Sequence, residues 1–265
     1  MLSAELDQKI RWLTKRNNFS RLMFARSGSF TFLIQLCVGT CTRILIFIGA
    51  TETALRIRTH RLSSIQRYRT ECEQTFHSMI SSGAYNLFLD FGAHAGEQSL
   101  GATKFLAVRA YEPDPRALVK LEARLRETPT GPHPFELFRL AVSNKDGTAY
   151  MKSSESAPDS TGGSTISSGK QGFQFGNSIE VATVDVYSIL SDLIDPKKTI
   201  VKIDIEGEEY PVLSRMAKHP NFKKLGAVFV EFHQRKLSNG AWLSLLLTLT
   251  FWRHGLSRFR LIEWF

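Results

Sequence analysis

Hydrophobic residues in the first 82 positions recur at the spacing of amphipathic helices. Two runs, over 2–13 and 55–79, place apolar side chains three and four residues apart and predict helices. Between them lies the apolar stretch 30–49, FTFLIQLCVGTCTRILIFIG, which is long enough to cross a bilayer core. Arg43 lies inside this stretch, and an arginine deep in a span costs roughly 2.5–3.5 kcal/mol. We therefore expect a buried or interfacial helix here, with a single membrane span as the alternative.

After Gly83 the pattern changes to short apolar segments that alternate with amphipathic helices. The predicted strands lie at 85–92, 107–113, 135–143, 179–184, 199–205, 226–233 and 259–265. The predicted helices lie at 96–106, 115–127, 208–219 and 241–254, with a further short one after Asp185. Strands that alternate with helices predict an α/β fold in which helices flank a mostly parallel sheet. Residues 153–178, rich in Ser and Gly, are predicted to form a mobile loop.

The basic charge of the chain is concentrated before the α/β region. The formal net charge is +9, and residues 1–85 hold 12 Lys and Arg against 5 Asp and Glu. We therefore treat 1–82 as a basic helical extension suited to an anionic membrane surface. Nucleic-acid binding is disfavoured, because these basic residues lie outside the α/β region and lack aromatic residues at stacking intervals.

The cysteine content is typical of a reducing compartment. Cys37, Cys41 and Cys72 make no disulfide framework, and none has the spacing of a metal ligand beside a histidine pair. We therefore expect a cytoplasmic protein, either associated with a membrane or anchored by a single pass through 30–49.

Residues directly after the first two strands have the chemistry of an adenosine-binding site, because ligands of open α/β sheets bind beyond the carboxyl ends of the strands. The first strand leads into DFGAHAG, in which Gly92 and Gly96 allow the backbone to approach a ligand closely. Glu112 follows the second strand at a distance suited to ribose hydroxyls. Asp90 precedes the glycines, where it repels a dinucleotide pyrophosphate and suits the cationic S-adenosylmethionine. The pattern therefore favours the methyl donor over a nicotinamide dinucleotide.

A dense group of carboxylates follows the strand at 199–205, within the segment IVKIDIEGEEYPVL. We expect Asp204 and Glu206 to face the ligand cleft. Glu208 and Glu209 fall in the first turn of the next helix, where acidic residues suit the helix macrodipole. This role accounts for Glu208, whereas the role of Glu209 stays open.

The residues beyond these strand ends also suggest a catalytic base. Asp204, Glu206 and His233 are side chains able to accept a proton from a nucleophile, and they are the candidates for this role. The alternative is a metal site built on Asp204 and Glu206. We disfavour it because the segment supplies two ligands only, and a third would have to come from Glu231 or His233.

Four segments over 85–235, DFGAHAG, YEPDP, AVSNKDG and IVKIDIEGEEYPVL, resemble the FkbM-type methyltransferases in order and spacing. The resemblance implies a Rossmann-like class I fold over 83–265, S-adenosylmethionine as cofactor, and methylation of a hydroxyl on a sugar or a polyketide-like metabolite. By position, it implies that the cofactor lies against Asp90, Gly92, Ala93, His94 and Gly96 at its methionine end, Glu112 at its ribose, and Ala141 and Val142 near its adenine. His94 departs from the family, which usually has Asn there.

We therefore expect an S-adenosylmethionine-dependent O-methyltransferase that acts on a hydroxyl group of a small molecule. A nicotinamide-dependent Rossmann enzyme and a non-catalytic cofactor-binding module are the alternatives. The acceptor is expected to be selected by the segments with the least recognisable pattern, which are 1–82, 153–178 and the C-terminal residues.

Overall fold

The computed structural model describes residues 69–128, 130–152, 164–167, 178–233, 237–256 and 261–264. The predictions for 1–68, including the apolar stretch 30–49, lie outside these residues, as does most of the loop predicted at 153–178. Within the described residues, no helix is both long enough and apolar enough to span a bilayer.

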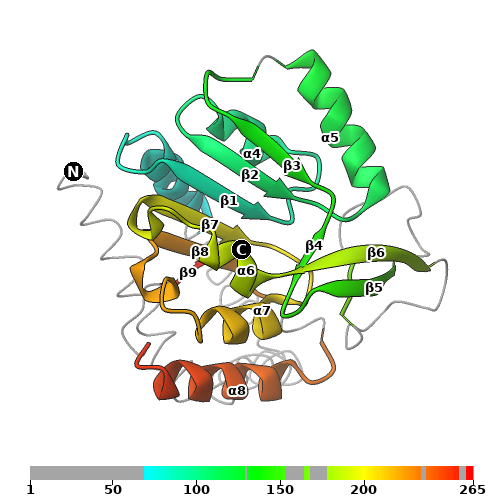
Figure 1. Ribbon diagram of the computed structural model, residues 1–265, viewed down its shortest axis with the longest axis vertical. Helices are drawn as coiled ribbons and strands as arrows, with labels where there is room; N and C mark the ends of the chain where they lie inside the picture. The colour runs from blue at the N-terminus through cyan, green and yellow to red at the C-terminus, as the bar shows by residue number, and fades with distance from the viewer. Residues whose placement is uncertain are drawn as a thin grey trace, which may run out of the picture.

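A six-stranded parallel sheet forms the centre of the fold (Figure 1). Its order is β3–β2–β1–β7–β8–β9, and every neighbouring pair runs parallel. The strands are β1 (Leu87–Phe91), β2 (Ala107–Tyr111), β3 (Phe135–Phe138), β7 (Thr199–Ile203), β8 (Ala227–Glu231) and β9 (Leu261–Trp264). The chain builds outward from β1 to β3 and then adds β7 on the other side of β1, so the strand order reverses between β1 and β7. The predicted Rossmann-like α/β fold is confirmed.

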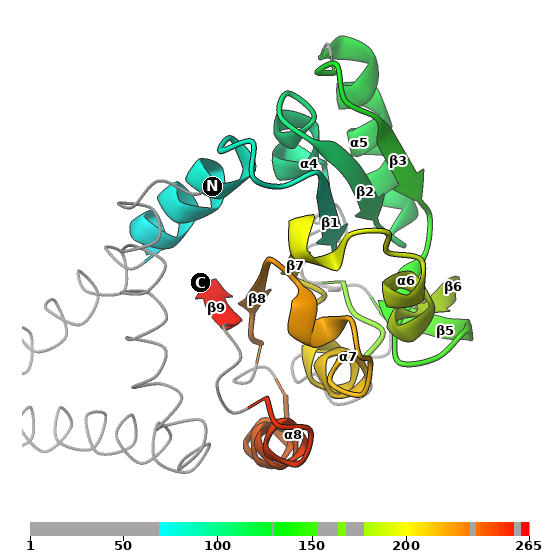
Figure 2. The ribbon, with the colours of Figure 1, turned by 60° about the vertical axis from the view of Figure 1, so that its left-hand side comes forward.

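Helices cover both faces of this sheet. They are α4 (Glu97–Ala102), α5 (Pro115–Glu127), α6 (Val186–Ser191), α7 (Glu209–Met216) and α8 (Gly240–Arg253), together with a helix at 69–80. One buried cluster joins the sheet to the helix at 69–80, α4 and α5, and a second joins it to α6, α7 and α8. Figure 2 shows α7 and α8 on the opposite side of β7 and β8 from the helix at 69–80, which is drawn in cyan. This three-layer arrangement leaves the carboxyl ends of the strands uncovered by either layer.

The helix at 69–80 packs directly on the sheet. Its Phe76 is fully buried and meets Phe88 of β1 and Phe229 of β8 edge to face, with ring centroids 5.2 and 5.3 Å apart. Cys72 and Met79, one turn away on either side, are buried with it. Full burial of a large apolar side chain contributes about 1.5–3 kcal/mol. The end of the predicted extension therefore contributes to the core that carries the site.

The segment predicted as one strand at 135–143 forms two strands in different sheets. After β3 the chain turns, and β4 (Ala141–Ser143) pairs parallel with β6 (Ser178–Asp185). β5 (Gly147–Lys152) pairs antiparallel with β6 and completes a three-stranded sheet. The break falls at Arg139 and Leu140, and the prediction was wrong because apolar residues lie on both sides of it, with Ala141 buried in a separate small core. The split brings the small sheet beside the strand ends of the main sheet (Figure 1).

The local signals at helix ends explain where two helices begin and end. Asp114 caps α5 by accepting a hydrogen bond from the N–H of Arg116, and Pro115 occupies the first helical position, as predicted. The helix predicted at 96–106 is shorter, because α4 ends at Ala102. The hydroxyl of Thr103 bonds the carbonyl of Leu100 and accepts the N–H of Gly131, which favours a turn over further helix.

Candidate active site

A cavity of about 340 Å³ opens beyond the carboxyl ends of β1, β2 and β7. Parallel α/β sheets bind ligands at this edge, next to the point where the strand order reverses. The wall contains most of the residues predicted to form the site, namely Asp90, Gly92, Ala93, His94, Glu112, Ala141, Val142, Asp204 and Glu206. Gly96 and His233 are the two predicted residues that do not contribute to this wall.

The turn after β1 requires glycine for a steric reason. Gly92 has φ 86°, and a Cβ at this position would overlap the carbonyl oxygen of Asp204. Its N–H and that of Ala93 both donate to the carbonyl of Tyr111, at 3.0 and 3.1 Å. The turn is therefore held between the ends of β2 and β7, and its backbone forms part of the cavity wall.

Gly96 lies behind this wall. It caps α4 with φ 77°, and a Cβ there would lie 3.0 Å from Cγ of Leu121 on α5. The glycine spacing indicated a ligand contact, and the structure places Gly96 at a close contact between α4 and α5.

Glu112 connects the ends of β1 and β2. Its two carboxylate oxygens accept the N–H of His94 and the N–H of Asp114, each at 2.8 Å. Burial raises the pKa of Glu112 to about 7, although the two backbone N–H groups and their hydrogen bonds oppose this shift. Each oxygen keeps a further lone pair, and the side chain lines the cavity, so the ionised form is able to accept hydrogen bonds from a ligand.

Asp90 and Lys202 form a buried ion pair at the floor of the cavity. They lie opposite each other in the register of β1 and β7, with Lys202 Nζ 3.3 Å from Asp90 Oδ1. The same ammonium reaches Asp204 Oδ2 at 3.4 Å, and Ser99 donates to Asp90 at 2.6 Å. Burial alone would lower the pKa of Lys202, but the charges of Asp90 and Asp204 outweigh burial and raise it. Lys202 therefore stays charged, and the negative charge of Asp90 is partly balanced within the protein.

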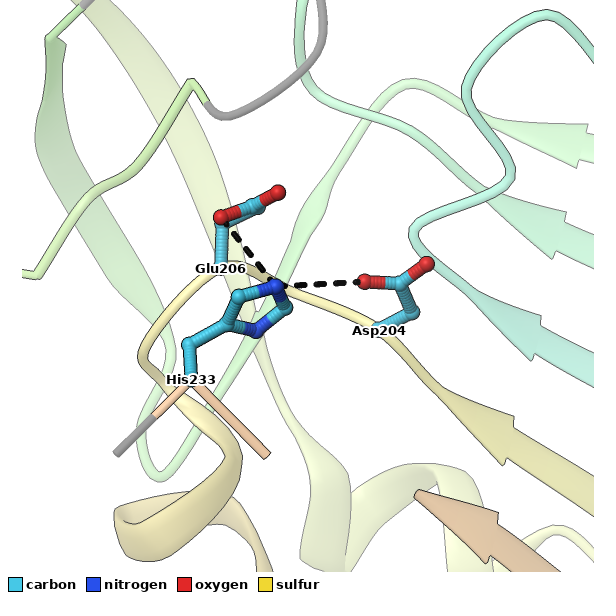
Figure 3. Close-up of side chains that lie close together, drawn as sticks. All are labelled: Asp204, Glu206 and His233. Atoms are coloured by element: carbon cyan, nitrogen blue, oxygen red, sulfur yellow. Dashed lines mark ion pairs between the residues drawn. The ribbon is translucent and has the colours of Figure 1, made fainter. Parts of the chain in front are cut away.

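Several carboxylates surround His233, and Figure 3 shows Asp204 and Glu206, which follow β7, beside its imidazole. The imidazole Nε2 lies 3.3 Å from Glu206 Oε2, 3.8 Å from Glu231 Oε1 and 4.0 Å from Asp204 Oδ1. Glu206 adopts φ 53°, a left-handed conformation that non-glycine residues seldom adopt. This conformation is energetically unfavourable for a glutamate, and it accompanies the placement of the Glu206 carboxylate beside His233. Sequence reasoning proposed Asp204, Glu206 and His233 together, and the structure brings them together.

The protonation of His233 bears on the choice of a base. Burial, the largest influence, lowers the pKa of the imidazole, but hydrogen bonds and charges from Glu206 and Glu209 raise it to about 9. With these residues alone around it, His233 carries a positive charge at neutral pH and has no lone pair to accept a proton. Asp204 and Glu206 are therefore the better candidates for the base.

Glu209 begins a helix and also contacts other residues of the site. It is the first residue of α7 and is fully buried. Its Oε1 accepts the N–H of Gly207 at 2.9 Å and lies 2.8 Å from Nδ1 of His233. Its Oε2 is buried and, among the described residues, has no hydrogen-bond partner. Glu208 precedes it, and burial, with the nearby charge of Glu209, raises the pKa of Glu208 to about 7.

Comparison with known families identifies the family of this chain. The family model described as the methyltransferase FkbM domain matches residues 90–255, which is more than half of the chain. The chain belongs to this family. No curated protein and no solved structure matched the chain in the corresponding searches. The resemblance inferred from the four sequence segments is confirmed, and the FkbM domain accounts for the six-stranded class I sheet described above.

Sequence reasoning missed several residues of the FkbM domain that contribute to this site. Lys202 was quoted in the motif without a role, although a lysine within the buried strand TIVKI was a usable signal. The cavity is also lined by Met151, Ser164 and Ile166, which come from the small sheet and the segment beside it. No local pattern marked these three, because the pairing of Lys152 with Thr165 is what brings that segment to the cavity.

Proposed function

We propose that this FkbM domain transfers the methyl group of S-adenosylmethionine to an oxygen atom of a small hydroxyl-bearing molecule such as a sugar. The observation that supports this most directly is a cavity whose wall holds two chemically different groups of residues. Glu112 and the Gly92 turn offer a surface for the cofactor, and Asp204 and Glu206 offer carboxylates for an acceptor. Methyl transfer needs a donor site and an acceptor site that meet in one space.

The residues present fit the cofactor. Glu112 has lone pairs for two ribose hydroxyls, and the turn at Gly92 leaves no side chain between the backbone and a ligand. Ala141 and Val142, with the neighbouring Met151, offer an apolar surface suited to an adenine ring. When bound, S-adenosylmethionine supplies an electrophilic methyl group on a sulfonium sulfur.

Asp204 and Glu206 serve the acceptor in this proposal. Their side chains are 29% and 20% exposed and line the cavity, so they are accessible to a hydroxyl group. One carboxylate accepts the hydroxyl proton while the oxygen forms its bond to the methyl carbon, and the carbon–sulfur bond breaks with its electron pair on sulfur. Positioned general-base catalysis of this kind typically contributes 10²–10⁴-fold.

Calorimetric titration with S-adenosylmethionine and with NADH tests the cofactor. We expect saturable binding of S-adenosylmethionine only, because Asp204, Glu206 and Glu231 present a row of negative charge to a pyrophosphate. Tight binding of NADH in its place would support the nicotinamide enzyme. A labelled methyl donor, incubated with small-molecule extracts and analysed by mass spectrometry, tests the transfer. Binding of the donor without any labelled product would leave a non-catalytic module.

A further inference from the structure

The cluster of Asp204, Glu206 and His233 has the arrangement of a divalent-cation site. Asp204, Glu206 and His233 each offer one ligand atom, and these atoms all lie within 4.8 Å of one another. The ligands come from two neighbouring strand ends, beyond β7 and β8, so the position is fixed by the register of the parallel sheet. The third ligand that the sequence alone left unassigned is therefore present.

Further carboxylates lie close to these three residues. Glu231 adds a carboxylate oxygen 3.8 Å from Nε2 of His233, and Glu209 adds one on the other side of the ring. Among the described residues, Lys202 is the permanent cation that contacts this group, and its ammonium is shared with Asp90. A divalent cation would add positive charge where these carboxylates gather.

A second, independent feature lies behind the histidine. Glu209 is fully buried, and its Oε1 lies 2.8 Å from Nδ1 of His233. An ionised carboxylate only accepts hydrogen bonds, so this contact holds the proton on Nδ1 and turns the lone pair of Nε2 toward Asp204 and Glu206. Metal-binding histidines almost always donate their other N–H in this way. Among the described residues, Glu209 contacts His233 and the N–H of Gly207 through Oε1, and its buried Oε2 has no hydrogen-bond partner.

We propose that Asp204, Glu206 and His233 bind a divalent cation, with Glu209 as the positioning residue for His233. Two carboxylate oxygens and one imidazole nitrogen suit Mn²⁺, because carboxylates favour hard cations whereas nitrogen is a poor ligand for Mg²⁺ and Ca²⁺. The cation takes the place of the second proton on the imidazole. The role given next to this cation rests on the proposed function, whereas its binding does not.

A cation at this position would bind the acceptor hydroxyl and lower the pKa of that group. With the cation bound, Asp204 and Glu206 would act as its ligands in place of the base, and the hydroxyl proton would pass to Glu231 or to water while the oxygen forms its bond to the methyl carbon. The carbon–sulfur bond breaks with its electron pair on sulfur, which leaves a neutral thioether. Three protein ligands leave coordination positions open on the cavity side, where Asp204, Glu206 and Glu231 form the wall.

Electron paramagnetic resonance of Mn²⁺ added to the chelator-treated full chain tests the site. We expect saturable binding to one site, with a nitrogen coupling in the pulsed spectrum that the variant His233→Gln lacks. Asp204→Asn should weaken Mn²⁺ binding at least tenfold while keeping the size of the side chain. Glu180→Gln removes an exposed carboxylate of β6 and should leave the affinity unchanged. Glu209→Gln should weaken binding about 10–100-fold without loss of the nitrogen coupling, as expected for a residue that orients a ligand.

Two results would overturn the proposal. One is the absence of saturable Mn²⁺ binding by the folded wild-type chain. The other is equal Mn²⁺ affinity in wild type, Asp204→Asn and His233→Gln, with circular dichroism showing that the variants are folded. Because no methyl donor is present, the outcome is independent of methyl transfer. A chain that binds S-adenosylmethionine and no Mn²⁺ contradicts the cation site alone, and a chain that binds Mn²⁺ and no S-adenosylmethionine contradicts the proposed function alone.

Discussion

In the proposed function, Glu112 combines a structural and a ligand-binding task in one side chain. It accepts two backbone N–H groups, one from the turn after β1 and one from the cap of α5. A carboxylate has about four lone-pair sites, so two remain for the cavity. This dual use explains why an acid is suited to this position although its burial is costly, as its raised pKa shows.

Glu112→Gln should weaken S-adenosylmethionine binding by about 1.5–3 kcal/mol, the range for hydrogen bonds to a charged group. The amide keeps the size of the side chain but offers one oxygen in place of two, so it cannot serve the turn and the ribose together. Calorimetric titration measures the change. Glu136→Gln on β3 is the matched control, because Glu136 is exposed and pairs with Arg109 outside the cavity. An unchanged affinity in folded Glu112→Gln would remove Glu112 from the cofactor site.

The affinity for S-adenosylmethionine should also depend on pH through Glu112. The free protein holds this carboxyl with a pKa of about 7, and its ionised form accepts the ribose hydroxyls. As pH falls below 7, Glu112 becomes protonated, and affinity should fall by at most about tenfold for each pH unit. Titrations between pH 8 and 5.5 measure this slope. The part due to Glu112 is the part that Glu112→Gln lacks, and identical slopes for both proteins would contradict the assignment.

Asp204→Asn and Glu206→Gln should each lower kcat at least tenfold while the affinity for S-adenosylmethionine stays within a factor of about three. The expectation follows from the typical 10²–10⁴-fold contribution of a positioned base. Both side chains line the cavity, and in the proposed function they serve the acceptor whereas Glu112 serves the cofactor. The measurement is methyl transfer to an identified acceptor, with the donor affinity taken from calorimetry. Full turnover in both amide variants would show that neither carboxylate acts in catalysis.

At the scale of elements, the site depends on how β1 and β7 meet. The register places Asp90 opposite Lys202, on the face of the sheet that also carries Phe88 and Ile200 toward the helix at 69–80. The ammonium of Lys202 then bridges Asp90 of β1 and Asp204 beyond β7. One lysine thus connects β1 to the carboxylate segment that follows β7.

Lys202→Met should lower the free energy of unfolding by about 3–5 kcal/mol, because it leaves the buried charge of Asp90 without its partner. The double variant Asp90→Asn with Lys202→Met removes both charges and should recover much of this loss. Urea unfolding of wild type, both single variants and the double variant measures the coupling. Additive effects of the two substitutions would show that the pair contributes no interaction energy.

At the scale of the whole molecule, part of the predicted N-terminal extension belongs to the core of the α/β domain. The helix at 69–80 is buried against β1 and β8 through Phe76, so a truncation that removes it exposes a large part of one core cluster. On the other side of the sheet, α8 presents an apolar surface with Trp242 and Trp252, which are 59% and 75% exposed. Membrane binding is therefore best tested on the full chain by changing charge.

The basic extension is predicted to bind anionic membranes. In vesicle flotation, the full chain should float with phosphatidylserine vesicles at low salt and less so at high salt. Replacing Arg21, Arg26, Arg56 and Arg58 by Gln should weaken this binding by about 1 kcal/mol for each residue near the surface. The matched control is a fourfold Lys→Gln variant at positions of the described domain, Lys104, Lys120, Lys145 and Lys198. Equal flotation of the arginine variant and wild type would contradict the prediction and direct attention to Trp242 and Trp252.

Local patterns in the sequence determined most of the fold and part of the site. The parallel strands β1, β2, β7 and β8 read as short apolar runs, because strands covered on both faces bury nearly every side chain. The cap of α5 could also be predicted from the sequence, because it is a local contact in which Asp114 bonds the backbone two residues away. Residues at strand ends could be assigned to a site because parallel strands all end at one edge.

The tertiary structure alone decided the contacts between distant residues. Nothing in the segment 135–143 marked the change from the main sheet to the small one, since burial on both sides of the turn calls for the same apolar residues. Lys202 lies 112 residues after Asp90, and His233 lies 24 residues after Glu209. At such separations the spacing in the sequence does not determine the distance between two side chains. The register of the strands determines it. The charge state of His233 followed only from those contacts, because the pKa of a buried imidazole depends on the carboxylates that surround it.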